Sequence, residues 1–287
     1  MARLYRSLLF VPGNNPRFLE KAKSSPADIV CFDLEDSVPD SEKKTARNLI
    51  KEALKSRSAY SSSVYVRTNS PISGKIPDDL KEIIQKGLDG IVIPKVNNAK
   101  EFSKIIKIVK SLEKKRKLKP VSIIPSIESA EGVVNTYEIA KSNKRIPAVV
   151  FGVFDLLNDM GIEYTKQSEG AKYARAKIPL DARAAGILAI DAIWQDLEDL
   201  EGLRQDCMIG KSLGYSGKSI IHPDQITPAH ELFAPNKSEI EWATKVCSVY
   251  ESSSQKGKGA TVVDGKMIDE VHYKQAKTLL EFIKSTL

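Results

Sequence analysis

Short apolar runs alternate with longer stretches of helical periodicity along the whole 287-residue chain. Each apolar run ends in polar residues, Gly or Pro, which is the pattern of strands that alternate with helices. The pattern predicts eight strands, at 7–11, 29–34, 63–68, 90–94, 121–127, 148–153, 188–194 and 218–221. It predicts helices between them near 16–24, 40–57, 77–87, 99–117, 130–143, 172–187 and 201–213.

Several of the predicted strands are apolar throughout, as expected for strands that are buried on both faces of a parallel sheet. Eight such units in a chain of this length favour an α/β fold of the (β/α)8 TIM barrel type over an open doubly wound sheet. No Gly-x-Gly-x-x-Gly follows the first run, so a dinucleotide-binding fold lacks its main motif. We predict a barrel over residues 1–235 and a C-terminal extension and lid over 236–287, with helical segments at 238–254 and from 271.

The net charge of +7 is concentrated in one segment, because residues 100–119 hold nine basic and two acidic side chains. A basic protein that binds nucleic acid or an acidic partner without catalysis is the alternative that this segment suggests. Its lysines at 104, 107, 110 and 114, however, have the spacing of one helix face, and apolar residues lie between them. We therefore favour a solvated helix face and expect no nucleic-acid partner.

The three cysteines, Cys31, Cys207 and Cys247, have unrelated spacings and form neither a zinc motif nor a disulfide framework. A reducing compartment is consistent with this usage. The apolar run at 8–11 is too short for a secretion signal and is read as a strand. No apolar run approaches the ~18 residues of a membrane span. We expect a soluble cytoplasmic protein with no membrane partner.

Polar residues close most of the predicted strands, where the active site of a (β/α)8 barrel lies. Glu128 and Asp155 each follow a very apolar run, so two carboxylates arrive at adjacent positions around the mouth. Two like charges about 4 Å apart repel by roughly 4 kcal/mol at an effective dielectric constant of 20. The pair therefore shares a proton or holds a cation, and oxygen ligands favour Mg2+. Ion pairs with basic residues of the rim are the structural alternative.

Arg67 ends an apolar strand and offers a planar fork for a carboxylate. A structural ion pair with Glu35 or Asp36 is the alternative for this arginine. Asp33, Glu35 and Asp36 follow the second strand. They are read either as first-turn acids favoured by the dipole of the next helix or as outer-shell ligands that act through water.

Lys95 closes the fourth strand and could act as a Schiff-base nucleophile, but nothing in the sequence shows it to be buried, so this role is not favoured. The three histidines share no metal-ligand spacing. We interpret all three as structural: His222, His230 and His272.

Nine segments, in order over nearly the whole chain, carry a resemblance to a known family. They are Arg6–Gly13 (RSLLFVPG), Phe32–Val38 (FDLEDSV), Val66–Asn69 (VRTN), Ile93–Lys95 (IPK), Ile127–Gly132 (IESAEG), Phe151–Leu156 (FGVFDL), Ala182–Asp191 (ARAAGILAID), Leu213–Pro223 (LGYSGKSIIHP) and Gly259–Asp269 (GATVVDGKMID). Together they resemble the citrate lyase beta subunit and malyl-CoA lyase family, acyl-CoA lyases of the Mg2+-dependent aldolase superfamily.

The resemblance implies that Glu128 and Asp155 are the direct ligands of Mg2+, with Mn2+ as a substitute. It implies that Arg67 binds the carboxylate of the oxo acid and stabilises charge on its oxygen. It also implies that Asp269 is a catalytic aspartate, which reaches the active site of a neighbouring subunit from the C-terminal lid.

Two further positions, Phe10 and Lys21, match residues that contact the CoA nucleotide in malyl-CoA lyases. One position departs from that pattern, because this chain has Asn15 where those lyases can carry arginine. Arg17 lies close by in the sequence and offers a substitute. The details of CoA binding are therefore expected to differ.

The expected function is Mg2+-dependent cleavage of a 3-hydroxyacyl-CoA between Cα and Cβ, with citryl-CoA giving acetyl-CoA and oxaloacetate favoured. Malyl-CoA and citramalyl-CoA are alternative substrates. A CoA-independent aldolase acting on 2-oxo-3-deoxy acids is a further alternative, but its usual catalytic histidine is missing, because no histidine precedes His222. The resemblance also implies a homo-oligomer, a trimer or hexamer, and citrate lyase alpha and gamma subunits as candidate partners.

Overall fold

Eight parallel strands close into a barrel in the computed structural model, which describes residues 5–166, 169–255 and 259–286. Each strand pairs with the next, and β1 pairs with β8, so the predicted (β/α)8 barrel is confirmed. The strands are β1 (Ser7–Pro12), β2 (Ile29–Asp33), β3 (Ser63–Arg67), β4 (Gly90–Ile93), β5 (Ser122–Ile127), β6 (Ala148–Phe151), β7 (Leu188–Asp191) and β8 (Gly217–Ile220).

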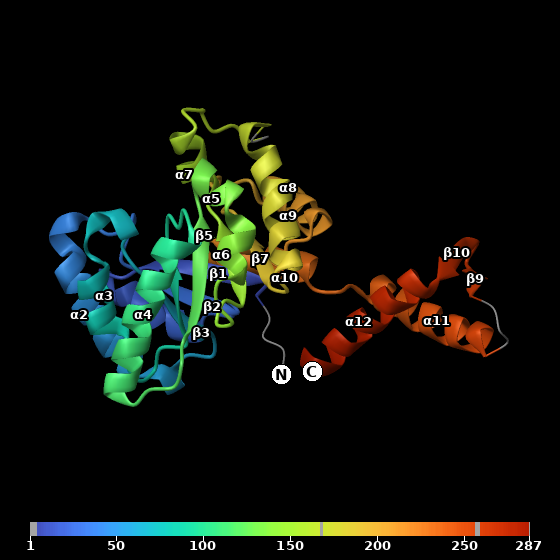
Figure 1. Ribbon diagram of the computed structural model, residues 1–287, viewed down its shortest axis with the longest axis horizontal. Helices are drawn as coiled ribbons and strands as arrows, with labels where there is room; N and C mark the ends of the chain where they lie inside the picture. The colour runs from blue at the N-terminus through green and yellow to red at the C-terminus, as the bar shows by residue number, and fades with distance from the viewer. Residues whose placement is uncertain (1–4, 167–168, 256–258, 287) are drawn as a thin grey trace. The chain divides into compact units, whose positions relative to one another are not determined.

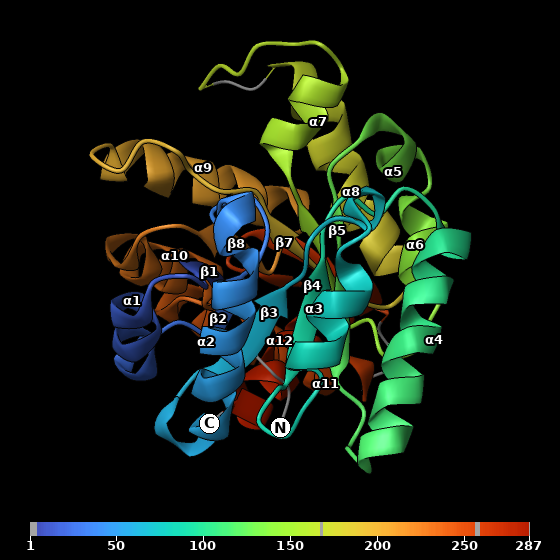
Figure 2. The same ribbon diagram turned by 90° about the vertical axis from the view of Figure 1, so that its left-hand side faces the viewer.

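Helices surround the strands of the barrel (Figures 1 and 2). They are α1 (Pro16–Lys21), α2 (Lys43–Lys55), α3 (Ile76–Ile83), α4 (Ala99–Arg116), α5 (Ala130–Val134), α6 (Thr136–Lys141), α7 (Val153–Asp159), α8 (Lys172–Ala184), α9 (Leu200–Leu213) and α10 (Ile226–Phe233). The sequence pattern did not predict α7 or α10. The predicted sixth strand was also too long, because β6 ends at Phe151 and α7 begins at Val153.

Alternation along the strands decides which side chains face the inside of the barrel. Cys31 of β2 and Tyr65 of β3 belong to one buried apolar cluster with residues of five other strands. Asp33 and Arg67 lie two residues further along the same strands, so they point the same way, one layer closer to the carboxyl ends. The apolar interior thus ends in a charged layer at the mouth.

The basic segment forms α4, and the amphipathic arrangement predicted for it is confirmed. Its apolar residues Phe102, Ile105, Ile106 and Val109 are buried, and its lysines at 104, 107, 110 and 114 are exposed. Asn98 caps the first turn through the backbone N–H of Glu101. Within the described residues, no helix has the length and apolar character that crossing a bilayer requires.

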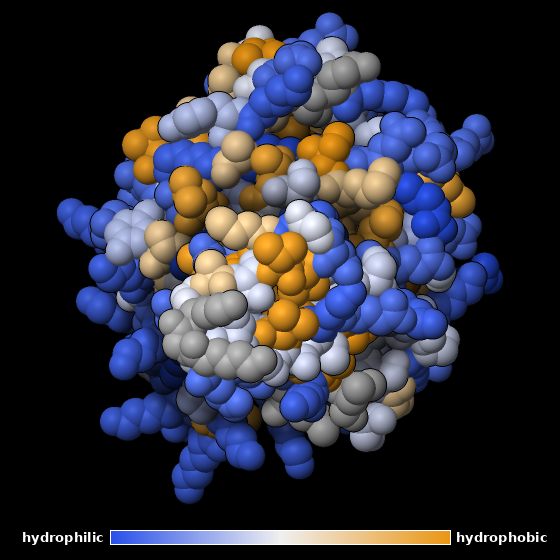
Figure 3. Space-filling view, turned by 90° about the vertical axis from the view of Figure 1, so that its right-hand side faces the viewer, coloured by the Kyte–Doolittle hydropathy of each residue, from blue (hydrophilic) through white to orange (hydrophobic). Residues whose placement is uncertain are grey.

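The described residues from Glu231 onward form a second compact unit, distinct from the unit of Tyr5–His230. It consists of α11 (Lys237–Ser254), a hairpin of β9 (Ala260–Val263) and β10 (Lys266–Asp269), and α12 (Glu270–Thr286). Val263 and Ile268 of the hairpin join its core, whereas Val262 and Met267, paired across the strands, are exposed. Figure 3 shows one face of the molecule, on which apolar side chains gather among hydrophilic ones. Residues 1–4 of the predicted barrel and Leu287 lie outside the described residues.

Candidate active site

A cavity of about 480 Å3 opens at the carboxyl ends of the barrel strands. Charged residues from four elements or the loops that follow them line it together with apolar side chains. The residues that line it include Phe10, Asp33, Asp36, Arg67, Ser126, Glu128, Asp155 and Ser219. The structure therefore brings both predicted metal ligands, Arg67 and Phe10 to one site.

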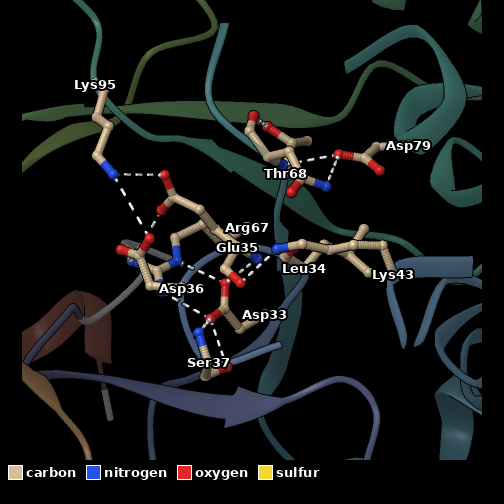
Figure 4. Close-up of polar contacts among 11 residues, drawn as sticks. Asp33, Leu34, Glu35, Asp36, Ser37, Lys43, Arg67, Thr68, Asp79 and Lys95 are labelled. Atoms are coloured by element: carbon tan, nitrogen blue, oxygen red, sulfur yellow. Dashed lines mark hydrogen bonds and ion pairs between the residues drawn. The ribbon is translucent and has the colours of Figure 1, made fainter. Parts of the chain in front are cut away.

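Asp33 and Arg67 form a bidentate pair between neighbouring strands (Figure 4). Arg67 Nε donates to Asp33 Oδ1 at 2.6 Å, and Arg67 Nη2 donates to Asp33 Oδ2 at 2.7 Å. Asp33 also accepts hydrogen bonds from the backbone N–H of Glu35 and from the N–H and hydroxyl of Ser37. Although burial opposes ionisation, Arg67 and these donors lower the pKa of Asp33 to about 2. Asp33 therefore has little acceptor capacity left for metal-bound water.

The remaining edge of the Arg67 guanidinium lies toward two acids, and its face packs on an aromatic ring. Nη1 lies 3.3 Å from Glu35 Oε2 and 3.9 Å from Asp36 Oδ2. The guanidinium carbon lies 4.6 Å from the centroid of the Phe10 ring, a cation–π distance. Burial lowers the pKa of Arg67, but the carboxylates of Asp33 and Glu35 outweigh this effect and raise it. Phe10 therefore packs on the arginine of the site.

Glu128 is a buried carboxyl whose Oε2 has no hydrogen-bond partner among the described residues. The backbone makes room for it at Gly152, where an added Cβ would lie 2.5 Å from Glu128 Cγ. Burial raises the pKa of Glu128, and the neighbouring Asp155 carboxylate raises it further, whereas Arg67 and a hydrogen bond from Ser126 act in the opposite sense. An unsatisfied buried oxygen is costly, so this carboxyl is suited to a ligand that the protein does not itself supply.

Asp155 lies in the first turn of α7, whose N-cap is Gly152, rather than at the end of a strand as predicted. Its side chain is half-buried, and Oδ1 lies 3.2 Å from the ammonium of Lys95. The same ammonium lies 3.1 Å from Glu35 Oε1 and 3.6 Å from Asp36 Oδ1 (Figure 4). Burial lowers the pKa of Lys95, but these carboxylates outweigh it and raise the pKa. A lysine held in the ammonium form is unsuited to Schiff-base chemistry.

Glu35 is buried beside both basic groups of the site. Burial raises its pKa to about 8, aided by the negative charges of Glu128 and Asp36 and opposed by Arg67 and Lys95. Within the part of the chain that the structure describes, neither of its carboxylate oxygens has a hydrogen-bond partner, because the contacts with Arg67 and Lys95 have ion-pair distances without hydrogen-bond geometry.

Buried polar side chains fix the loops that carry these groups (Figure 4). Lys43, the first residue of α2, donates to the carbonyls of Leu34 at 2.7 Å and Glu35 at 2.6 Å. Asp79 of α3 accepts hydrogen bonds from the backbone and side chain of Asn69. The loops after β2 and β3 are therefore held from outside the barrel, and the charged layer is preorganised.

Two predicted site residues lie elsewhere. Lys21 ends α1 and is exposed, and it does not line the cavity. Asp269 ends β10 in the C-terminal unit, where Oδ1 accepts a hydrogen bond from the Val271 N–H at 2.9 Å and lies 2.7 Å from Nδ1 of His272. The contact with His272 lowers the pKa of Asp269. His272, interpreted from the sequence as structural, is thus the partner of the predicted catalytic aspartate.

The carboxyl groups of the site fit a divalent cation. Once the bidentate Asp33–Arg67 pair is set aside, the acids of the described cluster are Glu35, Asp36, Glu128 and Asp155, against the single ammonium of Lys95. Across the described ranges, no three His, Cys, Asp or Glu side chains form a complete ligand set. Mg2+ commonly keeps several waters and takes one or two protein carboxylates. Glu128 and Asp155 are donors of this kind.

Comparison with known proteins shows the family of the chain. The model of the HpcH/HpaI aldolase/citrate lyase family matches residues 6–223. A citrate lyase subunit beta of Leuconostoc mesenteroides subsp. cremoris is 36% identical over 269 residues, which cover 93% of this chain and 89% of the relative. A (3S)-malyl-CoA thioesterase of Cereibacter sphaeroides is 33% identical over 279 residues, which cover 97% of this chain and 94% of the relative.

Solved structures agree with this assignment. The structure of protein CitE from Mycobacterium tuberculosis in complex with magnesium, acetoacetate and coenzyme A superposes with a TM-score of 0.80 at 26% identity, and the match covers 97% of each chain. A citrate lyase from Burkholderia xenovorans LB400, at 17% identity, superposes with a TM-score of 0.89 and supports the fold alone. With the barrel and its acidic mouth, these matches establish that the chain belongs to the HpcH/HpaI aldolase/citrate lyase family and is a lyase.

Proposed function

We propose that the protein is a Mg2+-dependent carbon–carbon lyase that cleaves a 3-hydroxyacyl-CoA thioester, with citryl-CoA as the favoured substrate. The unpartnered buried oxygen of Glu128, in a cavity that Asp155 and Arg67 also line, is the observation that carries the proposal. The magnesium and coenzyme A of the CitE complex and the citrate lyase beta relatives support it.

Glu128 and Asp155 would hold the cation. When bound, Mg2+ supplies Lewis acidity toward the hydroxyl and carboxylate oxygens of the substrate. Glu128 is available for this role because its Oε2 is buried and accepts no hydrogen bond from the described residues. Asp155 lies beside Lys95 at the rim of the cavity. Mn2+ would serve as a substitute, since both cations accept oxygen ligands.

Arg67 would bind the carboxylate of the oxo-acid part and stabilise charge on its oxygen as the Cα–Cβ bond breaks. Asp33 fixes the orientation of the guanidinium through two hydrogen bonds, and the Phe10 ring supports its face. We therefore assign Asp33 to the orientation of Arg67. Glu35 and Asp36, which retain free oxygens or solvent access, are better placed for contacts through metal-bound water.

Asp269 would exchange a proton with the acetyl carbon, acting as the acid in cleavage and as the base in condensation. His272 lies beside this carboxyl, lowers its pKa and is positioned to hold the carboxylate. We propose that this residue serves the site of a second copy of the chain, in a trimer or hexamer. Lys21 is the proposed contact for the CoA nucleotide.

The proposal also covers the alternative acyl groups of the substrate, the partner subunits and the cellular location. Malyl-CoA and citramalyl-CoA are the alternative substrates, and citrate lyase alpha and gamma subunits are the proposed partners. The cytoplasm is the proposed location, because all three cysteines are free in the structure. The CoA-independent aldolase is not favoured, since no histidine precedes His222 in the sequence.

Purified protein with Mg2+ should release acetyl-CoA from at least one of citryl-CoA, malyl-CoA and citramalyl-CoA, and EDTA should stop the release. Chromatography of the CoA products separates carbon–carbon cleavage, which yields acetyl-CoA, from thioester hydrolysis, which yields free CoA. The second activity needs testing because one relative is named a (3S)-malyl-CoA thioesterase. Absence of EDTA-sensitive acetyl-CoA with all three thioesters contradicts the lyase proposal.

A further inference from the structure

Lys95 lies among three acidic side chains that come from two separate parts of the barrel rim. Its ammonium is 3.1 Å from Glu35 Oε1, 3.6 Å from Asp36 Oδ1 and 3.2 Å from Asp155 Oδ1. Glu35 and Asp36 follow β2, whereas Asp155 lies in α7. One positive charge therefore ties the proposed cation ligand Asp155 to the acids across the mouth.

The backbone at Lys95 is held in a conformation that lysine disfavours. Its φ is 53°, in the left-handed region. Among the described residues, the other non-glycine positions with positive φ are Lys117, which caps the C-terminus of α4, and Asp264, which lies in the β9–β10 turn. Lys95 has neither role. Glycine would adopt this conformation without strain. The strain at Lys95 is therefore offset by the gain from placing an ammonium among the acids.

The ammonium and a divalent cation would use the same carboxylate. Asp155 is one of the two proposed cation ligands, and its Oδ1 already faces Lys95. The side chain of Lys95 is 26% exposed, so solvent is available to an ammonium that moves away from Asp155. Its long and flexible stem permits such a movement without any change of the backbone.

We propose that Lys95 is the internal countercation of this acid cluster and that it withdraws from Asp155 when a divalent cation binds, so that it sets the affinity of the site for the cation. Without a cation, the lysine keeps the carboxylates assembled. With a cation, it remains beside Glu35 and Asp36. This inference rests on the proposed function only in taking Glu128 and Asp155 as the cation ligands.

The test measures Mn2+ binding to the full chain without substrate. Binding is followed by titration calorimetry and by the loss of the electron paramagnetic resonance signal of free Mn2+. Lys95→Met keeps the stem and removes the charge. We expect it to bind Mn2+ about tenfold more tightly than the wild type, because a competing cation has been removed. In EDTA it should melt at a lower temperature than the wild type. Saturating Mn2+ should raise the melting temperature of the variant by more than it raises that of the wild type.

Lys166→Met is the matched control, since Lys166 also bridges two acids, Asp196 at 2.8 Å and Asp199 at 3.0 Å, on the exposed surface. It should leave Mn2+ affinity unchanged. Lys95→Gly, which removes both the charge and the strain, is the second variant if Lys95→Met folds poorly, and it should bind Mn2+ more tightly as well.

Unchanged or weaker Mn2+ binding by the Lys95 variants overturns the inference, as does a wild-type protein that binds no Mn2+. These outcomes are separate from the fate of the lyase proposal, which acetyl-CoA release decides. A protein that cleaves the thioester with EDTA sensitivity while its Lys95 variants keep wild-type Mn2+ affinity refutes the countercation alone. Tighter binding in a protein without lyase activity supports the countercation and refutes the lyase.

Discussion

The carboxylate of Asp33 accepts two hydrogen bonds from the guanidinium of Arg67, across neighbouring strands and out of contact with solvent. Asp33→Asn should cost about 3–5 kcal/mol in the free energy of unfolding, because it leaves the buried charge of Arg67 without its main partner. Urea unfolding at pH 7 measures this loss. Asp40→Asn, which removes an exposed partner of Lys75, is the control and should change stability by less than about 1 kcal/mol.

The pKa of Asp33 also predicts a pH dependence. The pKa is about 2 in the folded protein, below its ordinary value of 3.8, so the unfolded chain binds the proton more readily. The stabilisation is complete above pH 4 and is lost as the pH falls toward 2. In Asp33→Asn, the free energy of unfolding should fall less steeply between pH 4 and pH 2. Equal slopes for the variant and the wild type contradict the assignment.

The strands were predictable because burial on both faces gives continuous apolar runs, and every predicted strand begins within one residue of an observed one. The end of β6 was not, because the apolar run continues through Val153 into α7 and hydrophobicity alone does not separate a buried strand from a buried helix. This is why Asp155 was placed on a strand. Glycine at 152, before the acid, was the available signal for the break.

The membership of the site was predictable from strand ends, but the pairing within it was not. Sequence order placed Glu35 or Asp36 as the partner of Arg67, whereas strand register puts Asp33 directly opposite it. The position of Lys95 among three acids depends on a backbone conformation that sequence does not reveal. Asp269 directly precedes α12 and His272 is the third residue of that helix, a spacing typical of N-caps that could have suggested their contact.

Removal of the charge at Glu128 should separate stability from cation binding. Glu128→Gln keeps the shape, and in EDTA it should melt at the same or a higher temperature than the wild type, because burial disfavours the ionised carboxyl. It should lose the increase in melting temperature that Mg2+ gives the wild type, and turnover should fall by more than about 100-fold. Differential scanning fluorimetry with and without Mg2+ provides the measurement. An undiminished Mg2+ effect would show that Glu128 is not a ligand.

Asp269→Asn should abolish acetyl-CoA release and leave Mn2+ affinity unchanged, because the residue belongs to the C-terminal unit and is proposed to move a proton. His272→Ala should lower turnover less, by about 10-fold, and raise the apparent pKa of the base, because the pKa of Asp269 is lowered by His272. The pH profile of kcat/KM measures the shift. Near-wild-type turnover by Asp269→Asn contradicts the catalytic assignment, whereas an unshifted profile in His272→Ala contradicts the positioning role.

A second charged cluster, outside the barrel interior, should matter for stability rather than for chemistry. Lys218 of β8 is fully buried and contacts Asp191 of β7 at 3.3 Å and Asp206 of α9, while Arg175 of α8 contacts the same two acids. Lys218→Met leaves the buried carboxylate of Asp191 and the partly buried carboxylate of Asp206 with one partner, and it should cost about 3–5 kcal/mol in unfolding free energy. Lys172→Met, which breaks an exposed pair, should cost less than about 1 kcal/mol.

Adding Asp206→Leu to Lys218→Met should recover part of the lost stability, since it removes the carboxylate left without its lysine, and the two changes should be non-additive in a double-mutant cycle. Turnover per folded molecule should stay within about twofold of the wild type in both variants, because neither Lys218 nor Asp206 lines the cavity, and the neighbouring Ser219, which does, lies on the opposite face of β8. Urea unfolding with parallel rate measurements tests both statements. A large loss of turnover with stability retained would instead connect this cluster to the site through β8.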